Sequence, residues 1–113
     1  MKKHEGLALA RRYLDALKAN GVPVQRVIVY GSVARDDATE ESDLDIAVIG
    51  RRFAASRHLE NMRCRRIRWN IDTRIEPICL HPDDFREPAF ALPREIARTG
   101  IEVYADFTIT KKD

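Results

Sequence analysis

The feature that most constrains the fold is the run Val27-Ile28-Val29-Tyr30, which is apolar throughout and is followed directly by Gly31-Ser32. A short, unbroken apolar run that ends at a turn residue is typical of a strand covered on both faces. We therefore predict a strand over residues 24–30 and place it at the centre of a sheet. This prediction puts the Gly31-Ser32 pair at the end of a buried element.

Two further strands are predicted from alternating side chains. Residues 43–49 form the first of them, closed by Gly50, with Leu44, Ile46 and Val48 on one face and Asp43, Asp45 and Ala47 on the other. Residues 71–80 form the second, with a polar face made of Asp72, Arg74 and Glu76. Pro77 removes a backbone donor, so we expect this strand to lie at an edge of the sheet or to be bulged there.

Three helices are predicted, the first two from amphipathic patterns and the third from a proline at its start and a glycine after its end. The first covers residues 5–18 and stops at Asn20-Gly21, and the third covers residues 93–99 before Gly100 and a short strand over residues 101–104. The second covers residues 52–68, with an apolar stripe of Ala55, Leu59, Met62 and Trp69 and with Arg57, Arg65 and Arg68 pointing away. Arg66 falls inside the stripe, so either the helix ends early or Arg66 extends its charged head outward along its apolar stem.

Length and composition indicate one domain over residues 1–113. The chain has 113 residues with 44% hydrophobic and 34% charged side chains, and it contains no linker or repeat. No apolar run approaches the ~20 residues that span a bilayer, and the N-terminal segment lacks the pattern of a signal peptide, so we expect a cytoplasmic protein. Cys64 and Cys79 lack metal-ligand spacing and are interpreted as core residues.

Asp43 and Asp45 are candidate metal ligands. On a strand, residues i and i+2 project to the same face, about 7 Å apart. Two carboxylates so close raise each other's pKa unless a cation lies between them, and hard oxygen donors suit Mg²⁺ or Mn²⁺. The alternative is that both side chains are simply solvated on an exposed strand face.

Gly31 and Ser32 are candidate phosphate-binding residues. A glycine at the end of a buried strand lets the backbone approach a ligand, and Ser32 could begin a helix whose free N–H groups hold a phosphate. Arg35 lies one turn further on and could add a charged donor. The alternative is an ordinary turn with a serine cap. Neither GxxxxGK[ST] nor GxGxxG occurs in the chain, which disfavours the two common phosphate-loop families.

The stretch from Gly31 to Asp45, GSVARDDATEESDLD, resembles the signature of the DNA-polymerase-β-like nucleotidyltransferases. In its GSxARxDxxxxSDxD form it is similar to their minimal members, the MNT domains, and PREIARTGIEVY resembles the helix and strand that end these domains. The resemblance implies an α/β (α+β) fold, with a small mixed sheet flanked by helices, and a single nucleotidyltransferase domain.

The resemblance also implies roles for individual residues. Gly31, Ser32, Arg35 and Ser42 would bind the nucleotide, and Asp43 and Asp45 would hold two Mg²⁺ ions. A third carboxylate on a neighbouring strand would complete the site. Glu76 and Asp72 share the polar face of the third strand, and we favour Glu76 because Asp72 could equally cap the preceding turn. The family more often has aspartate at this position, so Glu76 departs from the pattern.

The activity implied by the resemblance is nucleotidyl transfer, with ATP as the expected substrate, AMP as the transferred group and a hydroxyl as the acceptor. Similar minimal domains act with a helical HEPN-type protein, so we expect this chain to be the antitoxin of such a pair, docking through Arg57, Arg65 and Arg68. A second hypothesis is a catalytically inactive module that masks its partner. Nucleic-acid binding rests only on the arginines of the second helix and is not favoured.

Overall fold

The computed structural model describes residues 1–106. The elements in chain order are α1 (Lys3–Ala19), β1 (Val24–Tyr30), α2 (Gly31–Ala34), β2 (Leu44–Gly50), α3 (Arg57–Arg68), β3 (Ile75–Leu80), the 3₁₀ helix η1 (Pro82–Arg86), α4 (Ala91–Thr99) and β4 (Ile101–Ala105). No helix within this range is long and apolar enough to cross a membrane.

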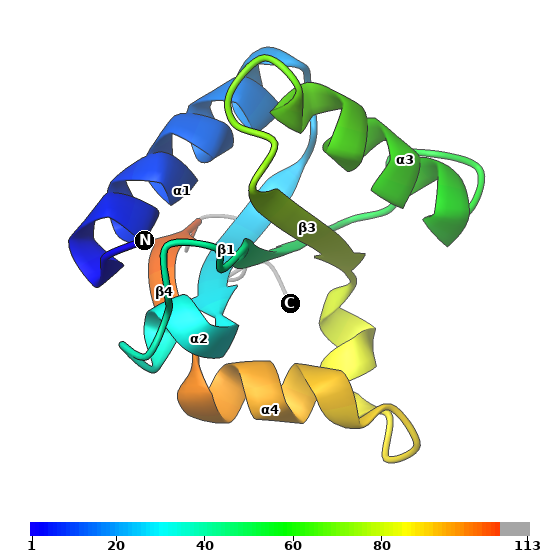
Figure 1. Cartoon of the computed structure of the whole chain (residues 1–113). Helices are drawn as coiled ribbons and strands as arrows, with labels where there is room; N and C mark the ends of the chain where they lie inside the picture. Colours follow the sequence, from blue (N-terminus) through cyan, green and yellow to red (C-terminus); the bar gives the residue numbers. More distant parts are fainter. Residues whose placement is uncertain (107–113) are drawn as a thin grey trace.

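The four strands form one mixed sheet in the order β3-β2-β1-β4. β1 runs antiparallel to both β2 and β4, whereas β2 and β3 are parallel. Helices α1 and α3 lie on one side of the strands and α4 on the other (Figure 1). The predicted mixed sheet, flanked by helices and with residues 24–30 as an inner strand, is therefore confirmed.

Each face of the sheet has its own core, as the alternation in β2 predicts. One face packs against α1 and α3 and contains, among others, Leu44, Ile46, Val48, Tyr13 and Cys64. The opposite face packs against α4 and contains Ile28, Ala47, Ile49, Leu80 and Ile96. The predicted core role of the cysteines is also confirmed, because Cys64 and Cys79 are buried free thiols.

β3 is an edge strand, as Pro77 predicts, and α3 covers its outer side. Arg68 Nη1 donates to the Ile75 carbonyl at 2.7 Å, and the Cys79 amide donates to Asn61 Oδ1 at 2.9 Å. Pro77 lies between these two residues and has no amide to leave unpaired. Two side chains of α3 thus form hydrogen bonds with backbone groups of β3 that would otherwise be free to pair with another strand.

The prediction that β3 begins at Ile71 is wrong. Residues 71–74 form a turn, in which Asp72 Oδ1 accepts from the Arg74 amide at 2.9 Å and from Arg74 Nε at 3.1 Å. A short aspartate readily stabilises a turn by accepting from a backbone amide two residues later, and this interaction competes with strand formation. Asp72 therefore does not share a strand face with Glu76.

The predicted apolar stripe of α3 exists, but it faces solvent instead of the core. Leu59, Met62 and Trp69 are 46%, 42% and 65% exposed, while the buried side of the helix carries Glu60, Cys64 and Ile67. Glu60 tolerates burial because its carboxylate accepts from the Phe53 amide at 2.8 Å and lies 2.9 Å from His81 Nε2. The helix begins at Arg57, after the cap residue Ser56, so Ala55 lies outside it.

The prediction that Arg57, Arg65 and Arg68 point away from the protein is wrong for two of the three. Arg57 donates both terminal nitrogens to Asp84, at 2.7 and 2.9 Å. Arg68 is only 15% exposed and pairs with Glu76. Fixed internal partners make Arg57 and Arg68 poor candidates for docking, whereas Arg65 remains 58% exposed.

Candidate functional site

The parallel pairing of β2 with β3 brings two of the predicted carboxylates together. Asp45 and Glu76 are direct register partners, and Tyr30 at the end of β1 pairs with Asp45 from the other side. Asp43 lies two residues before Asp45, just ahead of β2. All three carboxylates line one cavity of about 540 Å³, together with Tyr30 and the α3 residues His58, Asn61, Met62 and Arg65.

Gly31 lies next to the side chain of Asp45. Its φ of 74° lies in the left-handed region, which side chains other than glycine rarely adopt. A Cβ atom at this position would overlap the carboxylate of Asp45. Gly31 thus meets two demands at once: it turns the chain from β1 into α2, and it makes room for Asp45.

The cavity concentrates negative charge. The pKa of Asp45 is raised, first by burial and then by the charges of Asp43 and Glu76, while Arg35 opposes the shift. Burial, with Asp45 and Glu76 as further causes, raises the pKa of Tyr30 to about 12. A bound cation stabilises the charged form of a half-buried carboxylate that has negative neighbours, so the surroundings of Asp45 favour cation binding.

Glu76 is held by arginines of α3. Arg68 Nη1 lies 3.0 Å from its Oε1, and Arg65 Nη2 lies 3.6 Å from its Oε2. Arg68 Nε is buried and has no hydrogen-bond partner within the described residues. Burying the Arg68 guanidinium costs solvation free energy, and its ion pair with Glu76 is the main interaction that offsets this cost.

The donor set fits a hard divalent cation, although it is not assembled around one. Asp43, Asp45 and Glu76 supply only oxygen donors, which suit Mg²⁺ or Mn²⁺. Across residues 1–106, no three carboxylate, histidine or cysteine side chains are arranged so that they could hold a metal ion as they stand. Glu76, the third carboxylate, is instead paired with Arg65 and Arg68.

The two candidates for the third carboxylate are separated by the fold. Glu76 lies beside Asp45 in the sheet, whereas Asp72 lies in the preceding turn and is bound by Arg74. The Arg74 side chain also lowers the pKa of Asp72. Geometry therefore supports Glu76, and its catalytic role remains a prediction.

The predicted nucleotide-binding residues lie around the cavity without lining it. Ser32 is in the first turn of α2, and Arg35 follows that helix with its Nε 3.3 Å from Asp37 Oδ2. Ser42 Oγ accepts from the Thr39 amide at 2.8 Å and so closes the turn before Asp43. Their contact with a nucleotide remains a prediction.

Sequence reasoning missed the contribution of α3 to the cavity. His58, Asn61 and Arg65 reach it from one side of the helix. Their spacing of three and four residues could have indicated a shared polar face. The signal was obscured because the apolar residues of α3 were assigned to the core.

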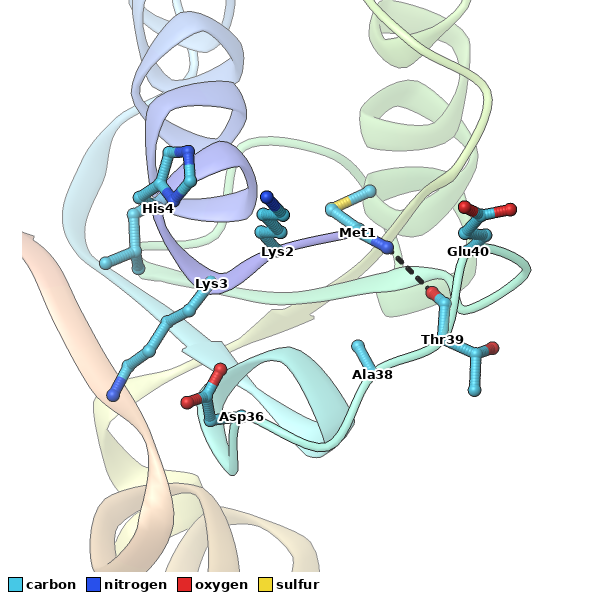
Figure 2. Close-up of a pocket in the computed structure, with 9 residues that line it drawn as sticks. Met1, Lys2, Lys3, His4, Asp36, Ala38, Thr39 and Glu40 are labelled. Atoms are coloured by element: carbon cyan, nitrogen blue, oxygen red, sulfur yellow. Dashed lines mark hydrogen bonds between the residues drawn. The ribbon is translucent and has the colours of Figure 1, made fainter.

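A larger cavity, of about 680 Å³, lies at the start of α1 and shares no lining residue with the carboxylate cavity. Figure 2 shows Lys2, Lys3 and His4 at the start of α1, with Asp36 below them near Lys3 and Glu40 to the right, beyond Met1. The amino group of Met1 donates to the Thr39 carbonyl at 2.7 Å. This cavity has mixed charge and none of the predicted site residues.

The family model described as "Nucleotidyltransferase domain" matches residues 10–103 of the chain. A Methanocaldococcus jannaschii protein with the provisional name protein adenylyltransferase is 42% identical over 41 residues. That match covers 35% of this chain and 41% of the relative, so it spans less than half of either protein.

Solved structures share the fold. A Sulfolobus solfataricus structure, provisionally described as a nucleotidyltransferase, has a TM-score of 0.67 and 17% identity, and covers 93% of this chain and 85% of that one. A second structure contains the tri-AMPylated Shewanella oneidensis HEPN toxin in complex with its MNT antitoxin. Its TM-score is 0.60 at 14% identity, over 94% of this chain and 77% of that one.

Proposed function

The chain belongs to the nucleotidyltransferase domain family, and we propose that it transfers AMP from ATP to a hydroxyl group of a partner protein. The observation that carries this proposal is the cavity in which Asp43, Asp45 and Glu76 meet beside the end of β1. The relative named as a protein adenylyltransferase supports AMP as the transferred group and a protein as the acceptor.

We assign Asp43 and Asp45 to a divalent cation, Mg²⁺ or Mn²⁺. When bound, such an ion neutralises charge on the phosphates and on the leaving pyrophosphate. Gly31, Ser32, Arg35 and Ser42 are assigned to the nucleotide, with Gly31 also making room for the Asp45 carboxylate. These residues position the triphosphate, which is the main contribution a protein makes to phosphoryl transfer.

Glu76 is assigned to the acceptor. Its carboxylate lies beside Asp45 and is oriented by Arg68, so it can accept the proton of a hydroxyl that enters the cavity. The oxygen of that hydroxyl forms a bond to the α-phosphorus of ATP, the bond to the pyrophosphate oxygen breaks, and pyrophosphate leaves. Arg68 thereby acts through Glu76 as a positioning residue.

We further propose that the acceptor is a HEPN-type helical protein and that the chain acts as its antitoxin. Support comes from the fold shared with the S. oneidensis MNT antitoxin, whose toxin partner carries three AMP groups. A cytoplasmic location follows from this role.

A masking module without catalysis is the second candidate. One observation favours it: Glu76 is paired with two arginines. The departure from aspartate that the family resemblance implies at this position agrees with it. In this case the chain would bind its partner without modifying it.

Ligand binding and group transfer test the proposal together. ATP with Mn²⁺ should raise the melting temperature, since a ligand that binds only the folded state stabilises it. The Asp43→Asn/Asp45→Asn double variant should lose the metal-dependent part of that rise, while the control Asp83→Asn, 90% exposed on η1, should keep it.

Mass spectrometry of a HEPN-type protein from the same genome, incubated with this chain, ATP and Mg²⁺, then separates the candidates. Added AMP that depends on Asp43 supports the enzyme. Tight binding without added AMP supports the masking module, and neither binding nor modification contradicts the proposed partner.

A further inference from the structure

The large apolar side chains that are exposed in residues 1–106 all belong to one face of α3 and its C-terminal cap. They are Leu59, Met62 and Trp69. Together with Arg66 they occur at steps of three and four residues, which places them in one stripe along the helix. We call Leu59, Met62, Arg66 and Trp69 the outer α3 surface. Contiguous exposed apolar side chains in a soluble domain mark an interaction site.

Arginines without carboxylate partners accompany this surface. Arg66 is exposed and has no ion pair within residues 1–106. Arg63 donates to the Asn20 carbonyl and its guanidinium lies 5.8 Å from the centre of the Phe53 ring, so its charge is also unneutralised. Arg57 and Arg68, by contrast, have internal acidic partners. The unpaired positive charge therefore lies on the same side of α3 as the apolar stripe.

The outer α3 surface borders a groove. A cavity of about 550 Å³ lies between α3 and the end of α1, lined by Leu59, Met62, Arg63, Arg66, Ala16 and Asn20 among others. Its volume and its partly apolar lining would suit apolar side chains that project from a partner. The flanking arginines would suit carboxylates beside those side chains.

Met62 connects this groove with the carboxylate cavity. Met62 lines both of them. His58 and Arg65 of the same helix line the carboxylate cavity with it. A protein that covers the outer α3 surface would therefore have one of its segments at the entrance to the carboxylate cavity.

We propose that the outer α3 surface is where the acceptor protein docks, through a patch of apolar side chains surrounded by carboxylates. The hydroxyl that receives the nucleotide is presented from the margin of that patch into the cavity that contains Glu76. This inference rests on the proposed function and adds to it the surface that selects the acceptor. The expected docking residues change accordingly: Leu59, Met62, Arg66 and Trp69 replace Arg57 and Arg68.

A protein partner fits this surface better than RNA does. Phosphates would be attracted by Arg63 and Arg66, and a base could stack on Trp69. A nucleic acid gains nothing, however, from Leu59 and Met62, which are apolar and aliphatic. Apolar side chains at the centre and charge at the rim are the usual composition of a protein interface. Binding to a single-stranded RNA is accordingly one outcome of the test.

The test uses two variants of the outer α3 surface that do not line the carboxylate cavity, Leu59→Glu and Arg66→Glu. The matched control is Arg11→Glu, which makes the same charge change as Arg66→Glu on the exposed side of α1. The probe is the HEPN-type protein from the same genome. Binding is measured by calorimetry at low and high salt, and AMP transfer is followed by mass spectrometry at acceptor concentrations below saturation.

We expect each variant to weaken binding at least tenfold and to slow transfer in proportion, whereas Arg11→Glu should do neither. The rise in melting temperature with ATP and Mn²⁺ should be unchanged in both variants, which also shows that they are folded. Binding of the original chain should weaken at high salt. If Arg66→Glu abolishes this salt dependence, Arg66 belongs to the charged part of the interface.

Unchanged binding and transfer in both variants overturns the docking surface and leaves the proposed function intact. If the unmodified chain neither binds nor modifies the probe while ATP and Mn²⁺ still stabilise it, the proposed partner and the docking surface both fail. Binding of a uridine dodecamer that is lost in Arg66→Glu, with acceptor binding unchanged, overturns the proposal in favour of nucleic acid.

Discussion

Arg68 donates from Nη1 to Oε1 of Glu76 at 3.0 Å, and the same nitrogen donates to the Ile75 carbonyl at 2.7 Å. One side chain of α3 thus fixes both the backbone of β3 and the carboxylate that lies next to Asp45. The orientation of the candidate catalytic glutamate consequently depends on a helix that is separate from the sheet.

Arg68→Gln should destabilise the protein, because it leaves the Glu76 charge and the Ile75 carbonyl without their donor. Lost hydrogen bonds to a charged, partly buried group cost about 1–3 kcal/mol. Urea unfolding would measure this cost. Arg66→Gln provides the control on the same helix, since Arg66 has no ion pair in the described residues. Equal stability of the two variants would contradict a role for Arg68 in holding β3.

Arg65→Gln should strengthen the binding of Mn²⁺ in the absence of nucleotide. Arg65 is mostly exposed and lies 3.6 Å from Glu76, so it competes with a cation for that carboxylate. A gain of several-fold in affinity, measured by calorimetry, is expected, and Arg63→Gln on the same helix should change little because Arg63 does not line the cavity. The gain should disappear when Glu76→Gln is also present, and a gain that persists there would rule out competition at Glu76.

Asp45→Asn should raise the melting temperature of the metal-free protein at neutral pH. The fold raises the pKa of Asp45 above its unfolded value of about 3.9. The folded state therefore holds the Asp45 proton more strongly than the unfolded state does. The free energy of unfolding falls as the pH rises from the unfolded pKa of Asp45 to its folded pKa. At higher pH the charged Asp45 carboxylate destabilises the folded state, and the uncharged asparagine removes this destabilisation. The measurement is a melting curve in the presence of a chelator.

Asp84→Asn should have the opposite effect on stability to Asp45→Asn. Hydrogen bonds from Arg57 lower the pKa of Asp84 in the folded protein. The ionised carboxylate therefore stabilises the fold at pH values above its unfolded pKa of about 3.9, and this stabilisation is lost as the pH falls through the folded pKa. The substitution should lower stability at neutral pH by about 1–2 kcal/mol. Shifts of the same sign for Asp45→Asn and Asp84→Asn would contradict the electrostatic description of the cavity.

Gly31→Ala should be more harmful than Gly21→Ala, although the two glycines have nearly equal φ angles of 74° and 75°. A left-handed conformation costs alanine roughly 1–2 kcal/mol at either position. At Gly21 the new methyl group would have open space, whereas at Gly31 it would overlap the Asp45 carboxylate. The difference between the two variants in urea unfolding isolates that contact, and equal losses would show that Asp45 moves aside freely.

The sheet could be predicted largely from the sequence, because its patterns are local. Alternation in residues 43–49 assigned Leu44 and Asp45 to opposite faces, and Pro77 indicated an edge strand. The proximity of Asp45 and Glu76 was implied by the family resemblance and not by alternation. The structure explains it, because β2 and β3 are parallel and these two residues are register partners.

The orientation of α3 could not be predicted in this way. Leu59, Met62 and Trp69 form the more hydrophobic stripe, but the helix buries Cys64, Ile67 and Glu60 instead. The burial of Glu60 depends on donors from Phe53 and His81, which precede and follow the helix in the chain. Such tertiary contacts leave no periodic signal, and the same holds for the pairing of Arg57 with Asp84 across 27 residues.

The covered edge of β3 also limits how copies of this chain can associate. A strand from another molecule would need the Ile75 carbonyl and the Cys79 amide as partners, but Arg68 and Asn61 already occupy them, and Pro77 offers no amide. Edge strands whose backbone groups are engaged by side chains resist the sheet-to-sheet pairing that leads to aggregates. The side of the sheet next to the carboxylate cavity is thus closed to self-association through strands, and the cavity stays open to a folded partner.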